Sequence, residues 1–252
     1  MDIDILTLFP QMFHGIIQES IVKRAIEKQL VQINPIDFRK FSENKHNKVD
    51  DYPFGGGAGM VIKPEPLHKA FQSLDLNPDS KVIYVTPKGK VFDQKKAKSL
   101  SEEKHLVILC GHYEGVDQRI IDKYVDEEIS IGDYVLTGGE IPAMVIIDSV
   151  IRLLPDALGK KESYEEDSHY NGLLEYPHYT RPKVFLDLEV PEVLLSGHHG
   201  NVDKWRHEQS LKITAERRPD MINNYKLSEE EKKYLKSLNI SKKYWIDTTK
   251  ML

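Results

Sequence analysis

Short segments of apolar and β-branched residues alternate with segments of helical spacing through about residue 158. The expected elements are strands at 2–9, 31–38, 81–86 and 105–110 and helices at 12–29, 64–74, 93–100 and 141–154. This alternation predicts a mainly parallel α/β domain. Glycine clusters follow some of the strands, where open α/β sheets place their ligands.

The chain changes character after residue 158. Residues 159–172 are polar and acidic, which predicts an interdomain linker. Helical patterns follow at 202–217 and 228–238, and Ser228 with Glu231 fits a capping box. We therefore expect an α/β domain over 1–160, a flexible linker over 161–172 and a small, mostly helical domain over 173–252.

Composition limits the classes of protein that the chain can be. Its 252 residues are 40% hydrophobic and 30% charged, as in an ordinary globular protein. The first residues do not form a signal peptide, no apolar run is long enough to span a bilayer, and the single cysteine fits a reducing cytoplasm. A net charge of -5 argues against a general nucleic-acid binder but leaves room for a local basic face.

The segment 130–142, S-I-G-D-Y-V-L-T-G-G-E-I-P, is the most informative part of the sequence. Gly132, Gly138 and Gly139 allow a close backbone approach to a ligand. Phosphate-binding loops usually pair their amide groups with a basic residue, and this loop has no Lys or Arg. It therefore predicts a site for a largely uncharged, planar ligand.

Two other glycine-containing turns are less specific. The turn at 110–119, C-G-H-Y-E-G-V-D-Q-R, is either a ligand-binding turn or an ordinary strand-to-helix turn with Asp117 as the helix cap. The loop F-G-G-G-A-G-M at 54–60 is either a connector or a loop that closes over a substrate. It does not fit a dinucleotide fingerprint, and the chain lacks a G-K-[ST] phosphate loop, so a nucleoside triphosphatase is excluded as a leading interpretation.

Candidate catalytic and RNA-contacting residues each have an ordinary explanation. Asp167 could act as a general base, although acidic linkers are usually only solvated. Arg152 could stabilise negative charge or simply pair with Asp148, four residues earlier on the expected helix. Residues 204–218 carry five Lys or Arg against two Glu, and they also include one Trp. This composition suits either RNA contact or an ordinary surface helix. The histidines have no convincing zinc-ligand spacing, so no metal site is expected.

Seven stretches in sequence order resemble the bacterial tRNA (guanine-N1)-methyltransferases that modify position 37, a family of the SPOUT class. They are D-I-L-T-L-F-P, F-G-G-G-A-G-M, C-G-H-Y-E-G-V-D-Q-R, S-I-G-D-Y-V-L-T-G-G-E, E-D-S, H-Y-T-R-P and R-R-P-D. The resemblance implies a deep trefoil knot in the α/β domain, a feature that periodicity cannot predict. It also implies a homodimer with shared active sites and S-adenosyl-L-methionine as the methyl donor.

The resemblance assigns roles to individual residues. Asp167 is expected to remove the proton from guanine N1, and Arg152 to stabilise charge on guanine O6. The positions matching the cofactor site are Tyr84, Pro87, Gly111, Tyr113, Glu114, Ile131, Gly132, Tyr134, Leu136, Gly138, Gly139 and Pro142. The residues expected to contact the tRNA substrate are Gly57, Ser163, Ser168, His178, Arg181, Arg206 and Arg217. Mg²⁺ is expected to support activity, although no metal cluster is visible in the sequence.

Two departures from the family pattern concern individual contacts. Lys88 in T-P-K-G replaces an expected glutamine, and S-G-H-H-G replaces S-G-N-H in the C-terminal domain. The alternatives are a SPOUT methyltransferase that acts on a ribose 2′-hydroxyl and a non-catalytic RNA-binding protein. Asp167, Arg152 and the glycine loop together favour guanine N1 methylation over both.

Overall fold

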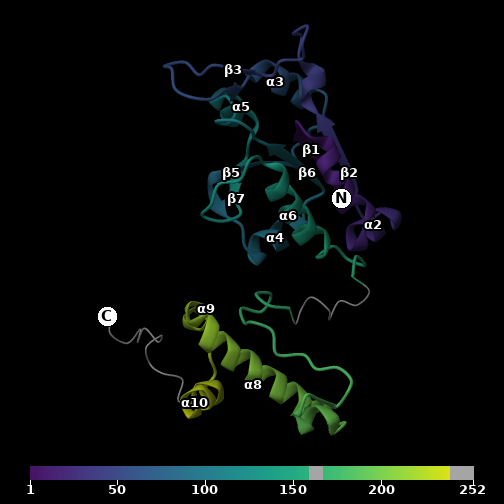
Figure 1. The fold of residues 1–252 in the computed structure, drawn as a ribbon, viewed down its shortest axis with the longest axis vertical. Coiled ribbons are helices and arrows are strands. Elements are labelled where there is room, and N and C mark those ends of the chain that lie inside the picture. Colours follow the sequence, from purple (N-terminus) through teal and green to yellow (C-terminus); the bar gives the residue numbers. More distant parts are fainter. Residues whose placement is uncertain (159–166, 239–252) are drawn as a thin grey trace. The chain divides into compact units, whose positions relative to one another are not determined.

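The computed structural model describes residues 1–158 and 167–238, and its contacts divide the chain into two units, Met1–Lys161 and Glu162–Leu252 (Figure 1). The predicted linker over 161–172 falls partly on 161–166, which lie outside the described residues. Residues 167–172 form turns. Each unit has a hydrophobic core of its own.

A five-stranded parallel sheet with the order β2-β1-β6-β5-β7 forms the centre of the first unit. Its strands are β1 (Asp2–Thr7), β2 (Gln32–Asp37), β5 (Ser80–Val91), β6 (His105–Cys110) and β7 (Glu127–Ser130). All six residues of β6 are buried, as expected for a central parallel strand that is covered on both faces. The predicted parallel α/β architecture is confirmed.

Helices cover both faces of this sheet (Figure 1). They are α1 (His14–Gln18), α2 (Ser20–Glu27), α3 (Pro64–Gln72), α4 (Gln94–Ser101), α5 (Gln118–Tyr124) and α6 (Glu140–Ile151), with 3-10 turns η1 (Pro10–Phe13) and η2 (Phe38–Phe41). Alternate residues of β6 belong to two different hydrophobic cores. Ile108 packs with α2, α4 and α6, whereas Leu109 packs with α3 and α5. This two-residue period is the normal consequence of the pleat.

The main differences from the prediction lie in the first unit. The single helix expected over 12–29 is wrong, because the chain is extended at Glu19 and Ser20 has a φ of 55°. That break separates α1 from α2. The strand expected over 81–86 continues to Val91 with a shift of register after Val85. Strand β7 was not predicted, because its sequence E-E-I-S offers only one apolar residue.

The remaining strands form two short antiparallel pairs. In the first unit β3 (Asp50–Asp51) pairs with β4 (Val61–Ile62), so these two strands flank the glycine loop at 54–60. In the second unit β8 (Val184–Phe185) pairs with β9 (Leu188–Glu189).

The second unit is mostly helical. Its helices are η3 (Glu192–Leu195), α8 (His199–Arg217), α9 (Pro219–Asn224) and α10 (Glu229–Ser237). Their shared core is small and consists of the buried residues Leu173, Leu211, Ala215, Ile222 and Leu235. The predicted capping box of Ser228 and Glu231 is present at the start of α10. Among the described residues, no helix combines the length and apolar content needed to cross a membrane.

Candidate functional site

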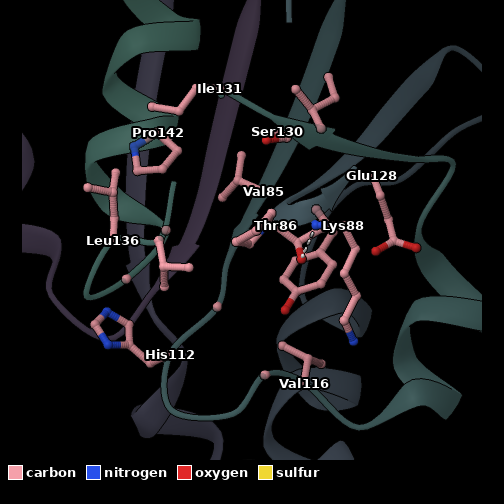
Figure 2. A pocket seen from close by; sticks show the side chains of 18 of the residues that line it. Val85, Thr86, Lys88, His112, Val116, Glu128, Ser130, Ile131, Leu136 and Pro142 are labelled. Atoms are coloured by element: carbon pink, nitrogen blue, oxygen red, sulfur yellow. Dashed lines mark hydrogen bonds between the residues drawn. The ribbon is translucent and has the colours of Figure 1, made fainter. Parts of the chain in front are cut away.

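A cavity of about 320 Å³ lies where β6 and β7 end and where the register of β5 shifts after Val85 (Figure 2). Three segments supply nearly all of its walls: 84–88, 111–118 and 128–139. Pro142, Leu136 and His112 lie along one wall, and Glu128 and Lys88 lie along the opposite wall. All twelve residues predicted to bind a cofactor line this one cavity. This is the carboxyl edge of the parallel sheet, where α/β folds place ligands.

Glycines let the turns around this cavity approach one another closely. A Cβ on Gly139 would come within 2.7 Å of Cys110 Cα and 2.9 Å of the Gly111 nitrogen. A Cβ on Gly111 would come within 2.8 Å of the Tyr84 hydroxyl oxygen. The Gly139 N–H donates a hydrogen bond of 2.9 Å to the Gly111 carbonyl, so the two turns are joined through their backbones. Glycine is therefore required at these two positions by space and not by backbone conformation.

The cavity has a small excess of acidic groups. Glu114 and Glu128 line it, whereas Lys88 is its one ammonium group among the described residues. Tyr84 also lines the cavity. Its burial and, to a smaller extent, the nearby Glu128 carboxylate raise the pKa of its hydroxyl. Glu128 was not predicted as a site residue, because strand β7 was not predicted. Lys88, which replaces an expected glutamine, lies in the same cavity. The lining suits a ligand with positive charge better than a phosphate.

A buried side-chain network lies beside this cavity. The Thr7 hydroxyl donates to Glu140 Oε1 at 2.6 Å, and His112 Nε2 lies 2.7 Å from Glu140 Oε2. Thr7 and Glu140 are almost completely buried, and a Cβ on Gly138 would collide with the His112 ring. Burial and, secondarily, the Glu140 carboxylate raise the pKa of the Cys110 thiol well above its usual value. Sequence reasoning missed Glu140, although a carboxylate between two glycines and an apolar helix is an unusual feature.

The glycine loop is attached to the 111–117 turn. The Glu114 N–H donates to the Met60 carbonyl at 2.9 Å, and the Ile62 N–H donates to the Gly115 carbonyl at 2.9 Å. Gly59 has a φ of +85° and packs directly against the Glu114 side chain. Gly57, a predicted substrate contact, lies in the same loop with a φ of +121° and open space around it. One end of the loop is therefore fixed to the cavity wall and its tip is exposed.

Comparison with known proteins identifies the family. The model of the family described as "tRNA (Guanine-1)-methyltransferase TrmD" matches residues 1–224. The chain belongs to the TrmD family. Similar proteins named tRNA (guanine-N(1)-)-methyltransferase come from Alkaliphilus metalliredigens (55% identical, covering 96% of this chain and 100% of the relative) and Desulforamulus reducens (56%, covering 94% and 95%). A protein of the same name from Staphylococcus haemolyticus is 52% identical, with 94% and 97% covered.

The two predicted catalytic residues of this TrmD-family chain belong to different units. Arg152 directly follows α6, and its N–H donates to the Asp148 carbonyl at 3.2 Å. Asp167 begins the described part of the second unit. There it lines a cavity of about 520 Å³ together with Tyr176, Arg206 and other polar residues.

The predicted substrate contacts of the second unit lie mainly on its surface. Arg206 sits over the Tyr176 ring with its Cζ 5.0 Å from the centroid. His178 is exposed and lies 2.7 Å from Glu175 Oε1, and the Ser168 hydroxyl accepts a hydrogen bond from the Glu175 N–H. Arg181 and Arg217 are exposed. Ser163 lies outside the described residues. These positions are thus present on one unit, but they do not line a single cavity.

The basic helix α8 shows the ordinary ion pairs of a surface helix. Lys204 lies 3.9 Å from Glu208, and Arg206 lies 3.9 Å from Asp203. Tyr179 and Trp205 add an aromatic pair with ring centroids 6.3 Å apart. Within residues 1–158 and 167–238, no group of three or more His, Cys, Asp or Glu side chains could hold a metal ion.

Proposed function

We propose that this chain transfers a methyl group from S-adenosyl-L-methionine to N1 of the guanine at position 37 of tRNA. The observation that carries the proposal is the convergence of twelve predicted cofactor residues, from 84–87, 111–114 and 131–142, on one cavity. Membership of the TrmD family and the printed names of its relatives favour guanine N1 over a ribose hydroxyl as the acceptor.

The cavity residues fit this donor in size, backbone exposure and charge. Its volume of about 320 Å³ lies at the lower end of the range for ligand pockets, roughly 300–1,000 Å³. Bare backbone at Gly111, Gly138 and Gly139 suits a planar adenosine group that approaches closely. When bound, S-adenosyl-L-methionine supplies a methyl group on a positively charged sulfur. Glu114 and Glu128 give the lining the charge that favours such a cation.

The chain's own residues prepare guanine for the reaction. Guanine N1 carries a proton and is a poor nucleophile until that proton leaves. We assign its removal to the Asp167 carboxylate and the stabilisation of charge on O6 to the Arg152 guanidinium. N1 then bonds to the methyl carbon as the bond from that carbon to sulfur breaks, and the electron pair stays on sulfur. Rate enhancement comes mainly from holding the reacting atoms in line.

The second unit is proposed to hold the tRNA. Its mixture of exposed cations and aromatic rings, including Arg206 over Tyr176, suits contact with phosphates and unstacked bases. The target guanine has to leave its stack to reach the donor. Because tRNA is the substrate, we place the enzyme in the cytoplasm. The proposed boundaries remain 1–160 for the donor domain, 161–172 for the linker and 173–252 for the tRNA-binding domain.

We also propose a homodimer and a trefoil knot. Ile141 and Val145 are exposed one helical turn apart on α6, and the nearby Val135 side chain is 84% exposed. Such an apolar surface is consistent with contact to a second copy of the chain. The hydrogen bond from the Gly139 N–H to the Gly111 carbonyl joins two of the loops that the knot would hold together. Mg²⁺ is not assigned a residue, because the described part of the chain offers no three-ligand group for it.

The function is tested by nucleoside mass spectrometry. An unmodified tRNA transcript is incubated with the protein and S-adenosyl-L-methionine labelled on the methyl group. We expect labelled 1-methylguanosine at position 37 and none in a transcript with another base at that position. Label on a ribose would overturn the proposed acceptor, and the absence of label from any nucleoside would overturn the proposed enzyme.

A further inference from the structure

We propose that Thr7, His112 and Glu140 form a clamp that holds two cofactor-binding turns in the shape that binds the donor. Glu140 is the central residue, because its two carboxylate oxygens bond to different parts of the fold. Oε1 accepts from Thr7 at the end of β1, and Oε2 pairs with His112 in the 111–115 turn. The inference rests on the proposed function, and it concerns positioning residues and not catalytic ones.

The location of Glu140 explains why it can control the cofactor loop. It is the first residue of α6, directly after Gly138 and Gly139. Any movement of its carboxylate therefore pulls on the end of the 131–139 loop. The Gly138 backbone lies so close to the His112 ring that a Cβ could not fit between them. The 111–115 turn and the 131–139 loop are therefore both packed against the His112–Glu140 pair.

The clamp is also anchored to the rigid sheet. Thr7 is completely buried, and its hydroxyl accepts a 2.9 Å hydrogen bond from the Phe9 N–H while donating to Glu140. The Phe9 ring meets the His112 ring edge-on, with centroids 4.9 Å apart. Thr7 and Phe9 thereby connect the two turns to β1, which lies between β2 and β6 in the sheet. A buried hydrogen-bond network of this kind fixes geometry when every member is satisfied.

A second histidine–carboxylate pair in the same sheet serves as a natural control. His105 Nε2 lies 3.0 Å from Asp4 Oδ2, and Asn34 donates to Asp4 Oδ1 at 3.0 Å. These three residues lie on β6, β1 and β2, whose positions are already fixed by the backbone ladder. The pair does not line the cofactor cavity. Breaking it should affect stability without affecting the donor site.

Loss of the clamp should weaken donor binding by making the correct loop shape less populated. If that shape falls from full to about one-tenth occupancy, the Kd for the donor rises about tenfold. The experiment compares Glu140→Gln with Asp4→Asn, two replacements that each turn one carboxylate of a histidine pair into an amide. Calorimetric titration with S-adenosyl-L-methionine should show a tenfold or larger rise of Kd in Glu140→Gln and no change in Asp4→Asn.

A second pair of variants keeps the test valid if Glu140→Gln does not fold. Thr7→Ser keeps the hydroxyl and should bind the donor like the wild type, whereas the similarly shaped Thr7→Val should not. Hydrogen exchange without donor should be faster in 131–139 of Thr7→Val than in Thr7→Ser. A merely structural threonine would change the global unfolding midpoint in Thr7→Val but would leave exchange in this loop and the donor Kd unchanged.

The remaining readout separates positioning from catalysis. With saturating donor, Glu140→Gln should keep most of its kcat, because the loss lies in KM for S-adenosyl-L-methionine. A fall of kcat with an unchanged donor Kd would overturn the clamp. Failure of the wild-type protein to bind the donor would instead overturn the proposed function, and the exchange experiment without donor would still report on the clamp.

Discussion

The two units of the chain hold their candidate functional residues in different ways. In the first unit all twelve cofactor candidates line one cavity, supported by a five-stranded sheet with a core on each face. In the second unit the candidate tRNA contacts lie mainly on the surface of a helical unit with a small core. The donor site is therefore built mainly by backbone and packing, and the tRNA surface mainly by exposed side chains.

This contrast has a consequence for substitutions. A change in the first unit that adds one carbon to a close backbone contact should impair donor binding. A change of an exposed charge in the second unit should have a small effect on stability, because surface ion pairs contribute at most about 1 kcal/mol. Donor binding and tRNA handling should therefore be separable by single substitutions.

The largest separation is expected at Asp167. Asp167→Ala should lower kcat by about 10²–10⁴-fold, the usual contribution of a general base, while donor affinity stays unchanged. Single-turnover methylation and calorimetric titration measure the two quantities. Asp167→Asn is the matched control for shape, and it should be as inactive as Asp167→Ala. Normal turnover in either variant would remove this carboxylate from the mechanism.

The second-largest effect tests whether the units are independent in stability. Leu211 is nearly fully buried in the small core of the second unit. Leu211→Ala should destabilise that unit by about 2–5 kcal/mol and should accelerate hydrogen exchange in α8 and α10. Donor binding should persist, because the described residues that line the donor cavity all belong to the first unit.

Leu106→Ala provides the reciprocal variant, since Leu106 is a fully buried leucine of β6. It should accelerate exchange in the sheet and leave α8 protected. If either substitution loosened both units equally, the chain would unfold as one cooperative body, and the comparison of two separate supports would fail.

Next in size is the effect of one methyl group in the cofactor cavity. Gly139 has an ordinary helical backbone (φ -80°, ψ -7°), so alanine meets only a space restriction, from Cys110 and Gly111. Overpacking of this kind costs about 1–3 kcal/mol, which corresponds to a roughly 5- to 150-fold weaker donor affinity. Gly15→Ala is the control, because nothing lies within 4 Å of a Cβ there. Equal donor affinity in both variants would show that the close contact is not needed.

The sequence predicted those features that depend on local pattern. Strand 105–110 was predicted to the residue, because its apolar run is bounded by a histidine and a glycine turn. The Ser228–Glu231 capping box was likewise readable from two residues. In contrast, β7 forms by pairing with the edge of β5, which is a tertiary contact. Its sequence E-E-I-S has no hydrophobic pattern by which a strand could be predicted.

The cofactor cavity illustrates the same limit. Each glycine turn indicated a possible ligand site, but only the tertiary fold brings 84–88, 111–118 and 128–139 together. The identity of the donor came from family resemblance and not from the glycine spacing. The local sequence marks Glu140 as unusual but could not give its role, since its partners Thr7 and His112 are remote in sequence.

The smallest expected effect concerns acid titration of the second unit. Burial on its own would raise the pKa of Glu231, but hydrogen bonds from the Ser228 backbone and hydroxyl and from His207 lower it below its ordinary value of 4.5. A carboxylate with a lowered pKa stabilises the fold above that ordinary value, and the contribution disappears as the pH falls through the folded-state pKa. The start of α10 should therefore loosen as the pH falls below about 4.5. NMR amide shifts of Glu231 and its neighbours would follow this transition, and Glu231→Gln should abolish it. An acid transition that persisted in Glu231→Gln would assign the pH sensitivity to another group.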